Sequence, residues 1–88
     1  TMAVTVTIPA IFWGNPPASA QTITLEYKLY SASSWTLIDS SVQVDTDGTI
    51  LDSPLPSVAG LTEGTVYYLK ASNNCESPLE EFIQAINT

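Results

Sequence analysis

The sequence contains no histidine and no arginine, and it has only one cysteine, Cys75, and two lysines, Lys28 and Lys70. Metal centres, activated nucleophiles and phosphate-binding loops are built largely from these residue types. We therefore expect no enzyme activity and no cofactor. A single cysteine cannot form an internal disulfide, so the cysteine content leaves the redox compartment open. A buried, inert thiol is the usual state of a free cysteine.

Positive charge is also scarce, because nine aspartates and glutamates give a formal net charge of −7 at pH 7. A chain with this charge repels phosphate backbones and anionic lipid headgroups, and no basic cluster reverses the repulsion locally. We therefore expect neither nucleic acid nor a membrane surface as a partner. No apolar run approaches the ~20 residues that span a bilayer, so the sequence predicts a soluble chain without membrane insertion.

The N-terminus lacks the basic region and the apolar segment of a secretion signal, so any such signal is absent, removed or elsewhere in a longer chain. With 88 residues the chain is the size of one small domain, which buries only about 60–65% of its unfolded surface. Charged residues make up 12% of the sequence, so Thr and Ser must supply most of the solvated surface. This composition is typical of a β-rich domain.

Apolar and polar residues alternate along much of the chain, which indicates strands with one buried face. The alternation predicts strands over residues 4–8 and 23–30, with Ile23, Leu25, Tyr27 and Leu29 on one face of the second. Further strands are expected at 35–39, 42–44, 49–51, 66–72 and within 81–86. Asp45 to Gly48 is a turn signal, and Ser53 to Pro56 predicts an edge or a loop because proline cannot donate to a ladder.

About seven short strands separated by turns favour an all-β, two-sheet sandwich. No linker rich in Pro, Gly or Ser divides the chain, and no repeat appears. We therefore expect residues 1–88 to form a single domain.

The segment from Leu61 to Tyr67 resembles the E–F corner of fibronectin type III domains. It has a leucine, a turn that contains Gly64, and a tyrosine six residues after the leucine. The resemblance implies a Greek-key sandwich with a tyrosine corner, in which the Tyr67 ring fills the core and its hydroxyl bonds to upstream backbone. Trp13 with the two prolines after it is similar to the end of strand B, and residues 25–30 and Trp35 are similar to strands C and C′.

The N-terminus departs from this family, because only twelve residues precede Trp13. Residues 3–8 are either an abbreviated strand A, or they are strand B and strand A is missing. The second arrangement would leave an unpaired edge, and such an edge is a template for another chain. One hypothesis is therefore assembly by strand addition. Residues 40–53 also exceed the family's usual C′–E connection, which predicts an extra hairpin.

The carboxylates of Asp45 and Asp47 resemble part of a calcium loop, with Asp39 or Asp52 as further oxygen donors. A calcium loop of the EF-hand type needs further acidic ligands after the first two, and here Gly48 follows Asp47 directly. An ordinary solvated turn is therefore the favoured interpretation, and Asp45 and Asp47 are weak candidate ligands. A pair of carboxylates could in principle hydrolyse glycosides, but a sandwich of this size seldom provides the necessary cleft.

The resemblance places strands C and F side by side, and the alternation then places Lys28, Tyr30, Tyr68 and Lys70 together on the outer face of one sheet. Tyrosine is enriched at interfaces, so these residues are a candidate interaction patch. The alternative interpretation is a set of cross-strand pairs that stabilise the sheet.

Trp13, Trp35 and Phe12 could stack on a sugar ring. The family pattern instead makes Trp13 a core residue, as it does Leu61 and Tyr67, and Trp35 is expected to pack at a sheet edge.

These observations favour a non-catalytic structural or protein-interaction module of fibronectin type III type, acidic, from an extracellular protein or the surface of a virion. Its partner would be another protein or a further copy of itself. The alternative function is a carbohydrate-binding accessory domain of a secreted bacterial enzyme, with a glycan as its ligand.

Overall fold

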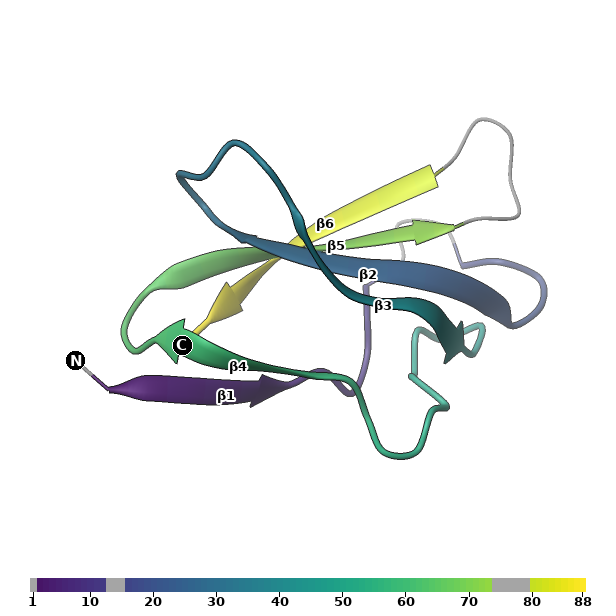
Figure 1. The fold of residues 1–88 in the computed structure, drawn as a ribbon. Coiled ribbons are helices and arrows are strands. Elements are labelled where there is room, and N and C mark those ends of the chain that lie inside the picture. Colours follow the sequence, from purple (N-terminus) through teal and green to yellow (C-terminus); the bar gives the residue numbers. More distant parts are fainter. Residues whose placement is uncertain (1, 13–15, 74–79) are drawn as a thin grey trace.

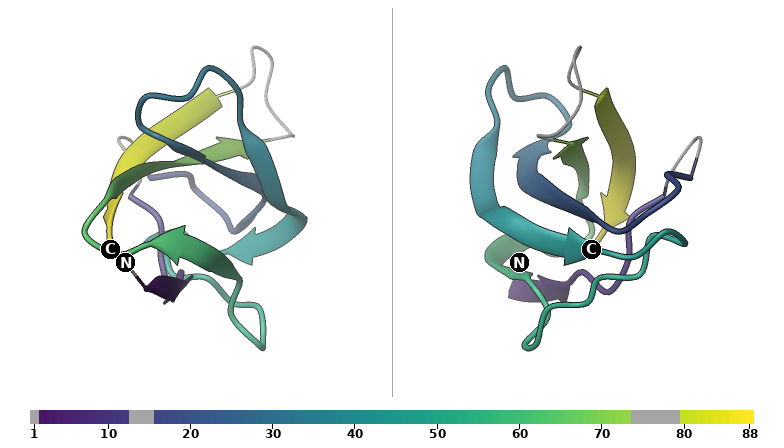
Figure 2. Two further views of the ribbon diagram at one scale, coloured as in Figure 1. Left: turned by 60° about the vertical axis from the view of Figure 1, so that its left-hand side comes forward. Right: turned by 90° about the vertical axis from the view of Figure 1, so that its right-hand side faces the viewer.

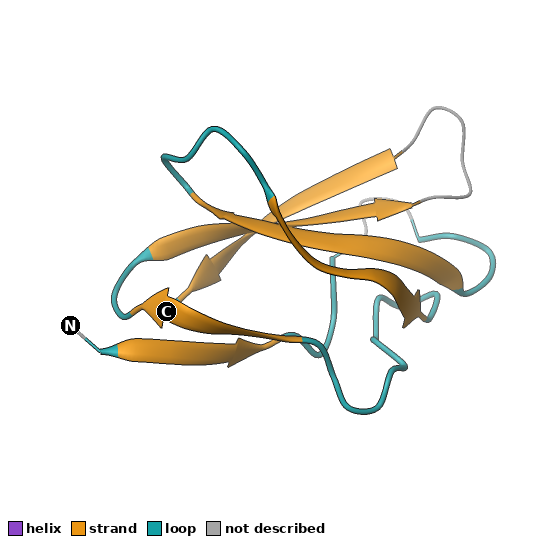
Figure 3. Cartoon of the chain, viewed as in Figure 1, coloured by secondary structure: helices purple, strands orange, loops and turns teal. Residues whose placement is uncertain are grey.

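The computed structural model describes residues 2–12, 16–73 and 80–88, and these residues form strands and loops with no helix (Figure 3). Two antiparallel sheets lie one over the other (Figures 1 and 2). One sheet has two strands in the order β1-β4, and the other has four in the order β3-β2-β5-β6. The strands are β1 (Ala3–Thr7), β2 (Gln21–Leu29), β3 (Thr36–Val44), β4 (Ser57–Thr62), β5 (Val66–Asn73) and β6 (Glu80–Asn87).

The all-β prediction is confirmed, and the described residues contain six strands. The segments expected at 35–39 and 42–44 belong to one strand, β3, and not to two, and this strand begins at Thr36. Shifts in its register with β2 near Leu25 interrupt the alternation that the sequence-based assignment relied on. Residues 49–51 form only isolated bridges, to Ala10 and to Val44, and no separate strand.

Strand β4 was not predicted, because its inward residues do not alternate. Val58 and Leu61 are both buried, although they are three residues apart. The register of β1 with β4 shifts between Val4 and Val6, where β4 has one extra residue. Gly60 lies at this irregularity with φ +78°, a conformation that glycine adopts without steric cost.

One hydrophobic core fills the space between the sheets. Strands β2, β3 and β5 contribute its most deeply buried side chains, and Ile23 and Leu25 are fully buried as the alternation predicts. The two-stranded sheet contributes Val58 and Leu61, and Val4 and Val6 pack against the core while partly exposed. Leu29 departs from the prediction for its face, because it lies at the end of β2 and is 37% exposed.

The segment after β3 turns back on itself as predicted for residues 40–53. The amide of Leu51 donates to the carbonyl of Gln43, and the amide of Asp45 donates to the carbonyl of Thr49. The returning arm also bonds to the chain after β1, since the amide of Ile11 donates to the carbonyl of Gly48 over 2.9 Å. The returning arm therefore links the chain after β1 to the end of β3.

Candidate functional site: the outer face of the four-stranded sheet

The four residues of the predicted patch lie on neighbouring strands. Lys28 of β2 is opposite Tyr68 of β5, and Glu26 of β2 is opposite Lys70 of β5. Tyr30 follows β2 directly, and its amide donates to the carbonyl of Val66. The structure therefore brings Lys28, Tyr30, Tyr68 and Lys70 together on the face of the sheet that points away from the core.

Both lysines are held by neighbouring groups of the same face. The Lys28 ammonium donates to the carbonyl of Ala32 over 2.8 Å and lies 5.9 Å from the centre of the Tyr68 ring. The Lys70 ammonium lies 3.4 Å from a carboxylate oxygen of Glu26. Positive charge above an aromatic ring is attracted by the π-system. The Lys28–Tyr68 and Lys70–Glu26 contacts are cross-strand pairs of the kind that the alternative interpretation expects.

Trp35 is the member of this face that the sequence analysis assigned to a sheet edge. It precedes the edge strand β3, but its ring lies 5.3 Å from the Lys28 ammonium and 4.7 Å from that of Lys70. The ring thus spans from β3 toward β5 and is itself half-buried. The rings and Glu26 cover the ammonium groups, and apolar and aromatic side chains are exposed around them.

Four side chains expose most of that apolar surface. Tyr30 is 59% exposed, Leu37 and Ile83 57% each, and Val66 39%. Leu37, Glu26, Lys70 and Ile83 follow one another across the sheet by register. The alternation does not reveal Leu37, because a register shift separates it from Asp39. It leaves Ile83 unassigned, because Phe82 and Ile83 are both apolar.

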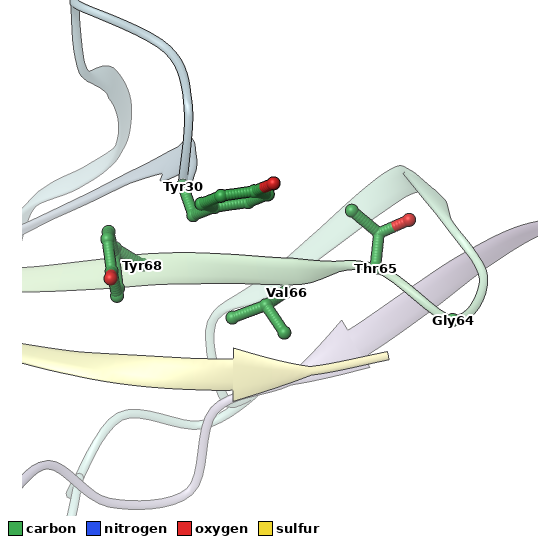
Figure 4. Close-up of a pocket in the computed structure, with 5 residues that line it drawn as sticks. All are labelled: Tyr30, Gly64, Thr65, Val66 and Tyr68. Carbon is green, nitrogen blue, oxygen red and sulfur yellow. The ribbon is translucent and has the colours of Figure 1, made fainter.

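A shallow hollow of about 420 Å³ adjoins the patch at the end of the sheet. Tyr30, Tyr68 and Val66 form its walls, and Gly64 and Thr65 of the turn before β5 close it (Figure 4). Gly64 has φ +73°, which a side chain would strain. The hollow offers aromatic rings, a methyl surface and a hydroxyl within one small area.

The tyrosine corner is formed as predicted. The Tyr67 hydroxyl accepts a hydrogen bond of 2.9 Å from the amide of Thr62, while the Tyr67 ring is buried and lies 6.4 Å from the ring of Tyr27. Leu61 is also a core residue, at 2% exposure. Trp13, the third predicted structural residue, lies outside the described residues, as does Cys75.

The carboxylates of Asp45 and Asp47 are used within their own turn. Asp45 accepts from the amide of Thr46 and Asp47 from the amide of Thr49, over 2.7 and 2.9 Å. Hydrogen bonds from the backbone and the side chain of Thr49 hold the pKa of Asp47 below that of a free aspartate. Across the described part of the chain, no three His, Cys, Asp or Glu side chains gather as a metal site would require.

The described residues include no helix long and apolar enough to cross a membrane. In comparisons with known proteins, no family model, no curated protein and no solved structure matches this chain.

Proposed function

We propose that this chain is a non-catalytic protein-interaction module of fibronectin type III type, from an extracellular protein or a phage particle, and that it binds a protein partner through the outer face of its four-stranded sheet. The observation that carries the interaction is the exposed apolar surface of Tyr30, Leu37, Val66 and Ile83 around the two covered lysines. Large exposed apolar side chains that gather on one face favour an interaction site, and tyrosine is enriched at interfaces.

Three features support the fold assignment. The hydroxyl of Tyr67 bonds to the amide of Thr62 across the corner between β4 and β5, as the resemblance implies. The segments compared with strands C, C′ and F are β2, β3 and β5, which are adjacent in one sheet. The pairing of β1 with β4 favours β1 as strand B, because strands B and E share a sheet in immunoglobulin-like sandwiches. A Greek-key sandwich is the arrangement that these features favour, and among the described residues no strand A pairs with β1.

A photo-crosslinking experiment tests the binding face. Replacing Tyr30 by p-benzoylphenylalanine puts a photoreactive ring of similar shape beside the hollow, and the same group in place of Ser53, an exposed loop residue, is the matched control. We expect a protein partner from the source organism to be crosslinked at position 30, to be absent at position 53, and to be lost when Tyr68 is also replaced by Ser. Equal crosslinking at both positions would contradict the proposal.

A carbohydrate ligand is the second candidate, because two exposed aromatic rings, Tyr30 at 59% and Phe12 at 76%, are free to stack on a sugar. A glycan array separates the two functions. Binding to defined glycans that Tyr30→Ser or Phe12→Ser abolishes would identify a carbohydrate-binding domain, and an array without signal leaves the protein partner as the explanation for the patch.

A further inference from the structure

On one side of the molecule, away from the outer face of the four-stranded sheet, each sheet has an edge strand without a neighbour among the described residues. Among the described residues, no strand pairs with β1 on the side away from β4, or with β6 on the side away from β5. A hollow of about 310 Å³ lies between these two sides. Its lining includes Val6 and Ile8 on the β1 side, Gln84 and Ile86 of β6 on the other side, and Leu69 of β5.

The open side of β1 presents main-chain hydrogen-bonding groups. The amide of Ile8 donates to the carbonyl of Pro56, and the carbonyl of Met2 accepts from the amide of Glu63. Even-numbered residues of this strand therefore bond toward the β4 side. Because successive residues of a strand direct their N–H and C=O groups to opposite sides, Ala3, Thr5 and Thr7 direct theirs to the open side.

Nothing in the sequence of β1 discourages pairing there. Its residues, AVTVT, include no charge, no proline and no glycine, which are common means of blocking an exposed edge. The irregularity in the β1-β4 ladder puts the extra residue on β4, at Gly60. The open edge of β1 itself is therefore a regular run of strand.

We propose that the open side of β1 accepts an extended peptide segment of another protein, which pairs with β1 as an added strand and covers the hollow. Strand addition to a sheet edge is an established mode of peptide recognition, in which main-chain hydrogen bonds give affinity and alternate side chains give specificity. This binding surface goes beyond the outer face described above and is separate from it.

The surroundings specify the chemistry of the segment. A residue that points inward from an added strand would lie against the partly exposed side chain of Val6 at the mouth of the hollow, where Leu69 and Ile86 are already buried. Every second residue of the segment is therefore apolar. The residues between them face solvent on a molecule of net charge −7, so lysine or arginine at these positions gains long-range attraction.

A second copy of this chain fits the open side poorly. Antiparallel pairing of β1 with β1 of another copy is two-fold symmetric, so both copies would contribute the same elements to the interface. In the right-hand view of Figure 2 the four-stranded sheet reaches beyond β1 on the side of β6. Each β6 would then compete with the other for one space, and two chains of charge −7 repel each other. A single extended peptide carries no second sheet, so it avoids the steric competition, and a basic peptide avoids the charge repulsion.

The test uses a capped peptide of about seven residues, enough to run the length of β1, that alternates valine with lysine and threonine. A peptide of the same composition with its valines adjacent is the control ligand. We expect the alternating peptide to bind in fluorescence anisotropy, and to slow the amide hydrogen exchange of Thr5 and Thr7. Thr5→Pro removes an outward N–H and leaves the β4 ladder intact, since proline is tolerated at such edge positions.

Thr5→Pro should weaken binding roughly tenfold or more, because a main-chain hydrogen bond is lost and the proline ring obstructs the edge. Thr5→Ala keeps the N–H and should bind within about twofold of the unaltered chain. Circular dichroism and thermal unfolding establish that both variants are folded. If Thr5→Pro unfolds, Thr7→Pro provides the same test at the next outward amide.

Three results would overturn the proposal. The first is equal binding of the peptide to the folded Thr5→Pro variant. The second is no binding to the folded, unaltered chain. The third is a dimer of the unaltered chain that Thr5→Pro converts to a monomer, which would make a second copy the occupant. The double variant Tyr30→Ser and Tyr68→Ser should bind the peptide normally, so failure at this edge is distinguishable from failure of the proposed function.

Discussion

The two sheets of this molecule are stabilised in different ways. In the four-stranded sheet, β2 and β5 each have a neighbour on both sides, and Ile23, Leu25 and Leu69 are at most 1% exposed. In the two-stranded sheet each strand has one neighbour, and Val4 and Val6 are only partly buried. An isolated pair of strands is marginal in water. The smaller sheet therefore depends on its attachments to the larger one.

Those attachments include the hydrogen bond from the amide of Ile11, in the chain after β1, to the carbonyl of Gly48 on the arm that returns from β3. The Tyr67 hydroxyl on β5 bonds to the amide of Thr62, and the Thr88 hydroxyl donates to the carbonyl of Thr62 or of Thr65. Val58 and Leu61 add apolar contact with the common core. Regions with fewer buried contacts open at lower free energy, so we expect the two-stranded sheet to be the first part of the molecule to open.

Truncation of a buried leucine should give the largest difference in stability and amide exchange between the two sheets. Leu69→Ala and Leu61→Ala each remove a buried leucine and should each destabilise the fold by about 2–5 kcal/mol. Leu61→Ala should also raise amide exchange in β1 and β4 far above that in β2 and β5, whereas Leu69→Ala should raise exchange throughout. Urea unfolding and hydrogen exchange measure the two effects. Uniform exchange in Leu61→Ala would contradict the difference between the sheets.

The tyrosine corner offers a smaller change at the contact between the sheets. Tyr67→Phe keeps the buried ring but leaves the amide of Thr62 without the hydroxyl, which should cost about 1–2 kcal/mol of folding free energy. The lower stability should come with faster exchange of β4 amides. Tyr68→Phe is the control, because no hydrogen bond is lost from the corner, and an equal loss of stability in both variants would refute the role of the hydroxyl.

Substitution of Gly60, at the irregularity in the two-stranded sheet, should have the smallest effect on stability. A Cβ at this position would meet no atom within 4 Å, but φ is +78°, so Gly60→Ala should cost about 1 kcal/mol from backbone strain alone. Gly60→Asn should cost less, since asparagine tolerates this region better. Thermal unfolding ranks the three chains. If stability instead falls with the size of the side chain, crowding and not backbone strain would be the cause of the loss.

The sequence predicts the four-stranded sheet better than the two-stranded one, for a physical reason. The alternation in β2 and β5 is regular because these strands are buried on one face, and it correctly placed Ile23 and Leu25 inside and Lys28 and Tyr68 outside. The bulge at Gly60 separates Val58 from Leu61 by three residues. A period of two cannot detect such a strand, so β4 was missed.

The candidate site was predictable in position but not in detail. Alternation and an assumed strand order brought Lys28, Tyr30, Tyr68 and Lys70 together. The Trp35 ring over both ammonium groups depends on where the loop after β2 directs its side chain, and the spacing of residues does not encode that direction. Likewise, the hollow beside β1 arises because one sheet is wider than the other, which no local pattern reveals.

The positions of the two chain ends have a mechanical consequence. Met2 is bonded to Glu63, and Thr88 is bonded to Thr62 or Thr65, so both ends are fastened to the same corner (Figure 2). A force that pulls these ends apart does not act along the length of β1 and β6. It peels each of them from its neighbour, so the load falls on a few hydrogen bonds at a time. The molecule should therefore unfold at low pulling force, even if it resists unfolding by urea.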